Sequence, residues 1–156
     1  MRVLGIDPGY DRLGVAVMEK KEGKETLIHS ECVLTDKKAT VPDRLLEIGS
    51  RLDALMLEYR PDQVAVETLF FNQNRTSAVA VAEARGVVIF LARKHGASVK
   101  EFGPQEVKVA VTGYGNSDKR AVMEMLKRLI TGLPPKALDD EYDAIAVAVT
   151  ALAHHR

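Results

Sequence analysis

The first third of the chain alternates short apolar runs with turn residues, which is a pattern typical of β-strands. Residues 2–6 form an apolar run that stops at Asp7-Pro8-Gly9, and residues 13–18 form a second one. After a charged turn at residues 20–24, a further apolar-rich stretch follows at residues 26–34. Strands separated by tight turns usually pair with their neighbours in the chain. We therefore expect three consecutive antiparallel strands.

Beyond residue 40 the spacing of the apolar residues changes to that of helices. From Val41-Pro42-Asp43 to Arg60-Pro61-Asp62, apolar residues recur every three or four positions, and a proline stands near the first turn. Farther on, short apolar segments with the length of buried strands alternate with helical stretches. The pattern predicts strands at residues 63–67 and 97–102 and helices at residues 76–94, 104–111, 117–130 and 139–153, with Ser117 as an N-cap.

The order of these elements, three strands followed by alternating helices and strands, defines an α/β fold. Strands joined through helices are usually parallel, so the expected sheet is mixed. It has five strands, with strands 1–3 antiparallel, and helices flank it. The 156 residues, 46% hydrophobic and 28% charged, suit one globular domain spanning residues 1–156. This composition excludes a disordered chain, a fibrous repeat and a coiled coil.

Charge is unevenly distributed along the chain, although the net charge is zero. Residues 85–136 hold 10 lysines and arginines against 4 acids, while residues 1–84 and 137–156 each carry a net charge of −3. A basic wall beside an acidic site is one interpretation, and ordinary solvated helix faces are the other. The neutral total argues against a protein that coats nucleic acid through its overall charge.

The cysteine content and the length of the apolar runs indicate where in the cell the protein is expected. The single cysteine, Cys32, cannot form an intrachain disulfide, and we expect it to be a small buried residue of a strand. No apolar stretch approaches the ~18 residues of a membrane span, and the first residues lack the apolar run of a secretory signal. We expect a cytoplasmic protein with no membrane contact.

Four acids occupy positions where α/β proteins commonly carry out chemistry. Asp7 and Glu67 each end an apolar strand, and Asp140 and Asp143 stand three residues apart at the start of the last helix. Ligands of open α/β sheets bind beyond the carboxyl ends of the strands, and residues three apart on a helix share a face. If the first and fourth strands are neighbours, the four side chains meet.

Four carboxylates in a partly dry site need protons or cations, because their charges repel one another. Hard oxygen ligands in this number suit Mg²⁺ or Mn²⁺, and two such ions can clamp a phosphodiester during hydrolysis. The sequence therefore predicts a metal site that cleaves a phosphodiester. For Asp7 the other interpretation is a turn former, while we interpret Asp139 and Glu141 as first-turn acids that favour the helix dipole.

Six short motifs follow one another along the chain. They are Gly5-Ile6-Asp7-Pro8-Gly9, Val66-Glu67-Thr68-Leu69-Phe70, Glu83-Ala84-Arg85-Gly86, Pro104-Gln105-Glu106-Val107-Lys108, Gly113-Tyr114-Gly115 with Lys119, and Asp140-Glu141-Tyr142-Asp143-Ala144-Ile145-Ala146. Each is weak alone, but together they cover nearly the whole chain and closely resemble the RuvC family of bacterial Holliday junction resolvases. The resemblance implies a ribonuclease-H-like fold, a homodimer and Mg²⁺-dependent, symmetrical nicking of two opposing strands at a four-way DNA junction.

The same resemblance assigns roles to the acids. Asp7, Glu67, Asp140 and Asp143 match the family's four catalytic, metal-binding acids. Asp139 adjoins Asp140, but the three-residue spacing to Asp143 favours Asp140. The resemblance further implies two Mg²⁺ ions in each active site, with Mn²⁺ as a substitute, and the branch-migration proteins RuvA and RuvB as partners.

Two aromatic residues are expected to contact DNA. Phe70 matches an aromatic that meets a base near the junction centre, and stacking of this kind contributes ~1–3 kcal/mol per base. We expect its neighbour Phe71 to pack in the core. Tyr114 stands between two glycines, in a loop whose backbone can approach a phosphate closely.

Basic residues are the remaining candidates for DNA contacts. Lys108 and Lys119 match basic residues near the scissile phosphate, where positive charge adds a salt-dependent attraction. Taken singly, each is better interpreted as an ordinary exposed lysine. Arg75 and Arg85 are further candidates for phosphate contacts, and Arg85 can instead pair with Glu83 or with the sheet edge.

Proteins with different functions share parts of this pattern. Gly-Ile-Asp-x-Gly also opens actin-like ATPases and sugar kinases, which need two such domains where 156 residues supply one. The acids would also suit a YqgF-type nuclease that acts on ribosomal RNA precursors, and the basic residues would suit a junction-binding scaffold without nuclease activity. In a homodimer, the Ala- and Val-rich helix at residues 76–94 is the expected interface, unless its apolar face all belongs to the core.

Overall fold

The computed structural model describes residues 1–68 and 75–155 and contains helices and strands in the predicted order. The strands are β1 (Arg2–Asp7), β2 (Arg12–Lys21), β3 (Lys24–Leu34), β4 (Gln63–Glu67) and β5 (Ser98–Phe102). The helices are α1 (Val41–Tyr59), α2 (Arg75–Lys94), α3 (Pro104–Thr112), α4 (Lys119–Leu129) and α5 (Asp139–Ala153). None of the described helices has both the length and the apolar character needed to cross a membrane.

A five-stranded sheet in the order β3-β2-β1-β4-β5 forms the centre of the structure. The pairs β1–β2 and β2–β3 are antiparallel, whereas β4 runs parallel to β1 and β5 runs parallel to β4. The prediction of a mixed sheet with three antiparallel strands is confirmed. The order also makes β1 and β4 direct neighbours, which is the condition for the predicted acids to meet.

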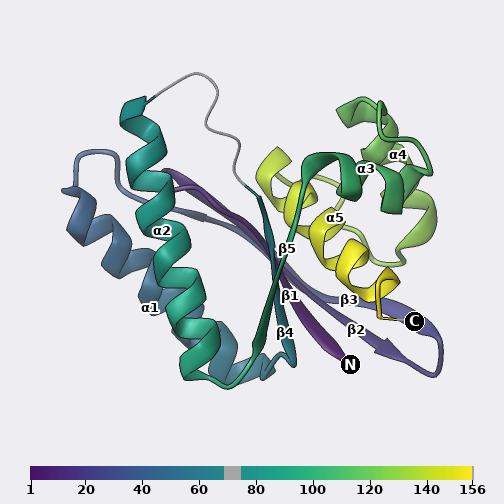
Figure 1. Cartoon of the computed structure of the whole chain (residues 1–156), viewed down its shortest axis with the longest axis horizontal. Helices are drawn as coiled ribbons and strands as arrows, with labels where there is room; N and C mark the ends of the chain where they lie inside the picture. Colours follow the sequence, from purple (N-terminus) through teal and green to yellow (C-terminus); the bar gives the residue numbers. More distant parts are fainter. Residues whose placement is uncertain (69–74, 156) are drawn as a thin grey trace.

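Helices cover both faces of this sheet, with α1 and α2 on one face and α3, α4 and α5 on the other (Figure 1). Because side chains alternate along a strand, each strand contributes to two separate apolar cores. On β1, Leu4 and Ile6 pack in the core beneath α1 and α2, whereas Val3 packs in the core beneath α5. Asp7 has the same parity as Val3, so it lies on the face that α5 covers.

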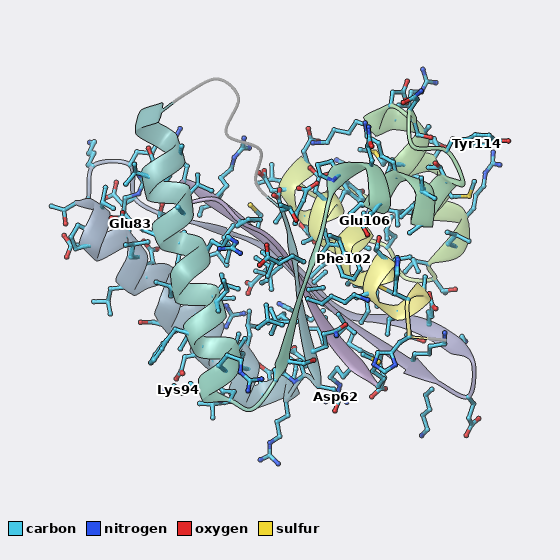
Figure 2. The ribbon with its side chains drawn as sticks, in the orientation of Figure 1. Asp62, Glu83, Lys94, Phe102, Glu106 and Tyr114 are labelled. Carbon is cyan, nitrogen blue, oxygen red and sulfur yellow. The ribbon has the colours of Figure 1, made fainter. Side chains whose placement is uncertain are left out.

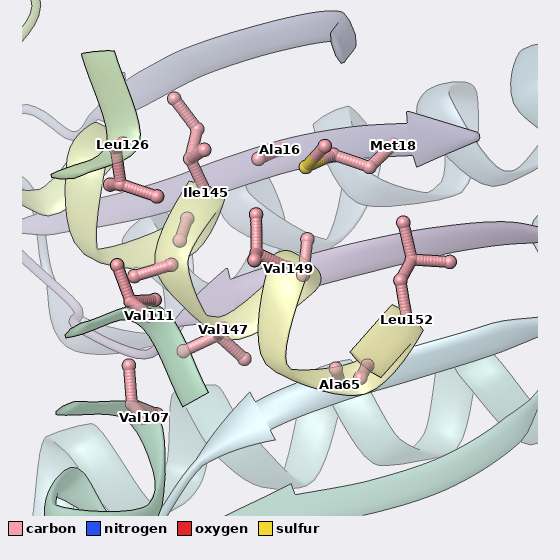
Figure 3. Packing of buried hydrophobic residues seen from close by; sticks show 14 of the residues in the cluster. Ala16, Met18, Ala65, Val107, Val111, Leu126, Ile145, Val147, Val149 and Leu152 are labelled. Atoms are coloured by element: carbon pink, nitrogen blue, oxygen red, sulfur yellow. The ribbon is translucent and has the colours of Figure 1, made fainter. Parts of the chain in front are cut away.

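The close contact of α5 with β1 and β2 depends on two glycines. A Cβ atom on Gly5 would stand 2.3 Å from the carbonyl oxygen of Ala144, and one on Gly14 would stand 1.8 Å from that of Asp140. Glycine at these positions therefore fixes how near the first turns of α5 come to the strand ends. The residues of α5 labelled in the core of Figure 3 are Ile145, Val147, Val149 and Leu152.

Two local predictions differ from the structure. The N-cap of α4 is Asp118 and not Ser117, because the carboxylate of Asp118 accepts a hydrogen bond of 2.8 Å from the backbone N–H of Ala121. The Ser117 hydroxyl is hydrogen-bonded at 2.7 Å to that of Thr112 instead. Cys32 lies on β3 as expected, but it is half-buried rather than buried.

Candidate active site

Asp7 and Glu67 are the last residues of two neighbouring strands and stand side by side. Parallel pairing places Ile6 opposite Val66, so the two acids are the next residues on neighbouring strands. The apolar residues before them are fully buried, whereas both acids are only partly buried. Their carboxyl groups therefore stand at the border between the core and the solvent.

The start of α5 brings the second pair of acids to the same end of the sheet. Figure 1 shows this helix beginning where β4 finishes. Asp140 and Asp143 are neighbours on one face of the helix because they are three residues apart. The negative charges of Asp140 and Asp143 both contribute to a raised pKa of Asp7, and that of Asp143 contributes to a raised pKa of Glu67, so the four carboxyl groups lie near one another. The structure thus brings together four acids from three separate parts of the chain.

Burial and mutual repulsion raise the pKa values of the two strand acids. Burial, followed by the charges of Glu67, Asp143 and Asp140, raises the pKa of Asp7 from 3.8 to about 7. Burial and then the charge of Asp143 also raise the pKa of Glu67, against the opposing charges of two lysines. The site therefore resists carrying four negative charges without added positive charge.

Two basic side chains supply part of that positive charge. Nζ of Lys119 lies 2.9 Å from Oδ2 of Asp143 and 3.4 Å from Oδ2 of Asp139. Burial alone would lower the pKa of Lys119, but its hydrogen bond to Asp143 and the charges of both aspartates raise it. On the other side, Nε of Arg12 lies 3.4 Å from Oδ2 of Asp140. Asp139 is 65% exposed and Asp140 only 23%, so Asp140 is the one that faces the cluster.

A hollow of about 180 Å³ opens beside the acids, between β4 and the helices α3, α4 and α5. Two acids and two lysines point into it from walls that are otherwise apolar. The residues that line it are Glu67, Pro104, Val107, Lys108, Lys119, Val122, Asp143 and Ala146. Both lysines singled out in the sequence are therefore next to predicted acids.

The donor set fits a hard divalent cation, since all four predicted ligands are carboxylates. Oδ2 of Asp140 is buried without a hydrogen-bond partner among the described residues. Over residues 1–68 and 75–155, no three acidic, histidine or cysteine side chains already stand in a metal-binding arrangement. In this structure Arg12 and Lys119 form ion pairs with the helix acids Asp140 and Asp143.

The other predicted DNA contacts have different outcomes. Lys108 lies on α3 and lines the hollow described above. Tyr114 is 76% exposed in the loop after α3, at the outer edge of the molecule (Figure 2), and it does not line the hollow. Phe70 and Phe71 lie outside the described residues, as does the side chain of Arg75.

Arg85 forms one of the two protein contacts predicted for it. Its guanidinium forms an ion pair with Glu101 of β5, an edge strand of the sheet, and not with Glu83. Arg85 is therefore engaged with the protein itself in this structure.

Sequence analysis missed two charged residues near the site and interpreted a third incompletely. Arg12 pairs with Asp140, as described above. Arg44 is only 5% exposed and pairs with Asp11. Glu141 does stand in the first turn of α5, but it is also buried at 9% exposure and accepts a hydrogen bond of 2.6 Å from the hydroxyl of Ser30.

A mixed sheet whose central strand and its parallel neighbour both end in acids, opposed by two acids of a covering helix, defines a protein of the ribonuclease-H-like class. The family model described as "Crossover junction endodeoxyribonuclease RuvC" matches residues 3–151. Proteins of that description from Alkaliphilus metalliredigens and Brevibacillus brevis are 44% and 41% identical to this chain. Each match covers 96% of this chain, and they cover 91% and 90% of the relatives. The chain belongs to the RuvC family of crossover junction endodeoxyribonucleases.

Solved structures agree with this assignment. Thermus thermophilus RuvC in complex with a Holliday junction substrate matches with a TM-score of 0.93 at 33% identity, over 100% of this chain and 95% of that one. The yeast mitochondrial Holliday junction resolvase Ydc2 matches with a TM-score of 0.72 at 14% identity, over 98% of this chain and 80% of that one. At this identity the likeness to Ydc2 concerns the fold alone. The predicted ribonuclease-H-like fold is confirmed.

Proposed function

We propose that this chain, as one nuclease domain spanning residues 1–156, resolves four-way DNA junctions by nicking two opposing strands. The observation that carries the proposal is the meeting of Asp7, Glu67, Asp140 and Asp143 at one end of the sheet in a member of the RuvC family. The Thermus thermophilus relative is described in complex with a Holliday junction substrate, which supports the same substrate for this chain.

The four carboxylates would hold divalent metal ions, with Mg²⁺ as the expected ion, two ions in each site and Mn²⁺ as a substitute. When bound, such ions activate water and stabilise the leaving oxygen of a phosphodiester. Asp7 and Glu67 would hold them from the sheet, and Asp140 and Asp143 from α5. The pKa of Asp7, raised to about 7, supports this role, because a bound cation offsets the repulsion that raises it.

Lys119 and Lys108 would hold the substrate beside the acids. Both point into the same hollow as Glu67 and Asp143, so each stands where phosphate oxygens must approach. Lys119 forms ion pairs with Asp143 and Asp139, so its charge stands directly beside the acids. Phe70 and Tyr114 remain proposed DNA contacts, as does Arg75, on the strength of the family resemblance.

A homodimer fits both the proposed reaction and the surface of the α1–α2 layer. Two symmetrical cuts need two sites related by a two-fold axis. A groove of about 690 Å³ runs between α1 and α2, and on α2 the side chains of Phe90 and Val79 are 66% and 61% exposed. These two exposed apolar side chains, beside the groove, support α2 as the interface. RuvA and RuvB remain proposed partners from the resemblance.

The test is cleavage of three labelled substrates: a synthetic four-way junction, a linear duplex and an RNA of matching sequence. Each is incubated with Mg²⁺, with Mn²⁺ and with a chelator. We expect paired, ligatable nicks in the junction alone, and only with a divalent ion. Equal cutting of the duplex would refute the structural selectivity, and preference for the RNA would favour a nuclease of ribosomal RNA precursors.

Asp143→Asn tests the site itself. Loss of one metal-binding carboxylate should lower the cleavage rate by about 100-fold or more, as removal of a group that stabilises the transition state does. Junction binding should persist, because the basic contacts remain. Glu47→Gln, a change of the same kind at an exposed position of α1, is the matched control. Near-normal cleavage by Asp143→Asn would show that the acids have been assigned wrongly.

A further inference from the structure

A second hollow, of about 730 Å³, lies beside the acids in a place that the proposed reaction does not use. It opens between the β1–β2 turn, the end of β3 and the start of α5. Its lining mixes apolar and polar residues and carries charges of both signs. The residues that form it are Gly9, Tyr10, Asp11, Arg12, Leu34, Thr35, Lys37, Val81, Leu138 and Asp140.

This hollow, which we call the Arg12 hollow, shares its acidic wall with the active site. Asp140 lines the Arg12 hollow, whereas Asp143 lines the smaller hollow with Lys119. The two aspartates are three residues apart on α5, so their Cβ atoms are about 5–6 Å from each other. The acids therefore have on each side of them a hollow that contains two basic side chains.

Among the described residues, the only charged group of the Arg12 hollow without an ion pair is the positive Lys37, and Arg12 is only partly engaged. Asp11 is already paired with the buried guanidinium of Arg44. Arg12 contacts Asp140 through Nε, but its side chain is 51% exposed, and its two terminal nitrogens have no hydrogen-bond partner among the described residues. Lys37 is exposed and forms no ion pair within residues 1–68 and 75–155. Both cations can thus meet an anion from solution.

Buried contacts hold the walls of the hollow in place. Arg44, only 5% exposed, donates from Nε to the hydroxyl of Thr35 at 2.9 Å, and its guanidinium lies 4.4 Å from the ring centre of Tyr10. The Thr35 hydroxyl in turn donates to the carbonyl oxygen of Tyr10 at 2.6 Å. These bonds tie the β1–β2 turn, which leads directly into Arg12 at the start of β2, to the end of β3, shortly before Lys37. A ligand would meet a wall that is already ordered.

We propose that the Arg12 hollow is a second phosphate subsite, which binds a phosphodiester of the substrate strand next to the one that is cut. Arg12 and Lys37 are its positively charged groups. A guanidinium binds phosphate oxygens through parallel N–H donors, and a DNA strand presents a phosphate at every nucleotide. A strand that crosses the acids would therefore have one phosphate near Lys119 and another near Arg12. Attraction on both sides would offset its repulsion by the acids between them.

This inference rests on the proposed function, and its test separates the two. Equilibrium binding of a four-way junction is measured by fluorescence anisotropy in a chelator, so that neither cleavage nor bound metal contributes. The affinity is followed from 50 to 200 mM salt for the wild-type protein and for Arg12→Gln and Lys37→Gln. Lys24→Gln is the control, because it removes an equally exposed charge at the far end of the β2–β3 hairpin.

Each lost phosphate contact should reduce the slope of log affinity against log salt concentration by about 0.9. Over this fourfold range of salt, the wild-type protein should lose about 3.5-fold more affinity than either variant. The control should keep the wild-type slope, and Arg12→Lys, which retains the charge, should restore most of it.

Two results would overturn the subsite. One is a wild-type slope in both Arg12→Gln and Lys37→Gln. The other is a change in Arg12→Gln alone, which would mean that Arg12 acts only by compensating Asp140. A wild-type protein that binds no junction at all would instead contradict the proposed function.

Discussion

The protonation of Asp7 should govern how the stability of the metal-free protein changes with pH. Its pKa is about 7 in the folded protein against 3.8 as the ordinary value. Between these two pH values the native carboxyl keeps a proton that the unfolded chain has released. The free energy of unfolding therefore falls as the pH rises through this range and is lowest above pH 7.

The size of the effect follows from the same two values. At about 1.4 kcal/mol per pH unit, their separation bounds the penalty at about 4 kcal/mol above pH 7. Asp7→Asn keeps the shape of the side chain and removes the charge, so the variant should escape this penalty. For a protein of this size, the bound corresponds to a melting temperature higher by at most about 8–16 °C.

The assay is thermal unfolding followed by circular dichroism from pH 4 to pH 8 in a chelator. Asp7→Asn and the wild-type protein should be close in stability at pH 4, with the variant progressively more stable toward pH 8. Glu47→Gln, the exposed control, should follow the wild-type protein at every pH. Divalent metal should raise the stability of the wild-type protein at pH 8 and narrow the difference. A difference between Asp7→Asn and the wild-type protein that does not change with pH would refute the electrostatic account of the site.

Two further predictions concern the interface and the packing of α5. Phe90→Glu places a charge on the exposed face of α2, so sedimentation of this variant should show a monomer. Leu129→Glu, at a position of α4 that is 52% exposed, is the control and should sediment as the wild-type protein does. A dimer that survives Phe90→Glu would place the interface elsewhere. Gly14→Ala forces a methyl group to within 1.8 Å of the Asp140 carbonyl oxygen, so it should cost about 1–3 kcal/mol or more and lower the cleavage rate by displacing Asp140. Gly115→Ala, whose added carbon would meet Val109 at an ordinary 3.4 Å, is its control in thermal unfolding, and equal losses of stability in the two variants would contradict the steric argument.

The sheet and the meeting of the acids were predictable because both follow from short-range patterns. Apolar runs that stop at Asp7-Pro8-Gly9 and after Glu67 mark the carboxyl ends of buried strands. The order of elements then made β1 and β4 plausible neighbours, which their parallel pairing confirms. The prediction of Ser117 as the N-cap failed because the next residue, Asp118, is an equally good cap, and only the fold determines which side chain is free.

The buried charges could not be assigned from the sequence because each one depends on a partner far along the chain. Arg44 precedes Ile48 by one helical turn, and Glu141 likewise precedes Ile145, so both stand on apolar helix stripes. That position signals burial, but it does not identify Asp11 or Ser30 as the partner. Arg12 and Gly14 are two residues apart on β2 and therefore lie on the same face of the sheet. This spacing indicates the face on which Arg12 lies, but it does not identify Asp140 as its partner.

The division of the apolar interior by the sheet has a consequence for how such a protein can change over generations. One core lies beneath α1 and α2, and the other lies beneath α5. In the proposed dimer, mutations that reshape the first core would act mainly on the helices where two copies would meet. Mutations in the second core would act mainly on the helix that carries Asp140 and Asp143. Lineages that inherit this architecture can therefore adjust assembly and catalysis by separate evolutionary routes.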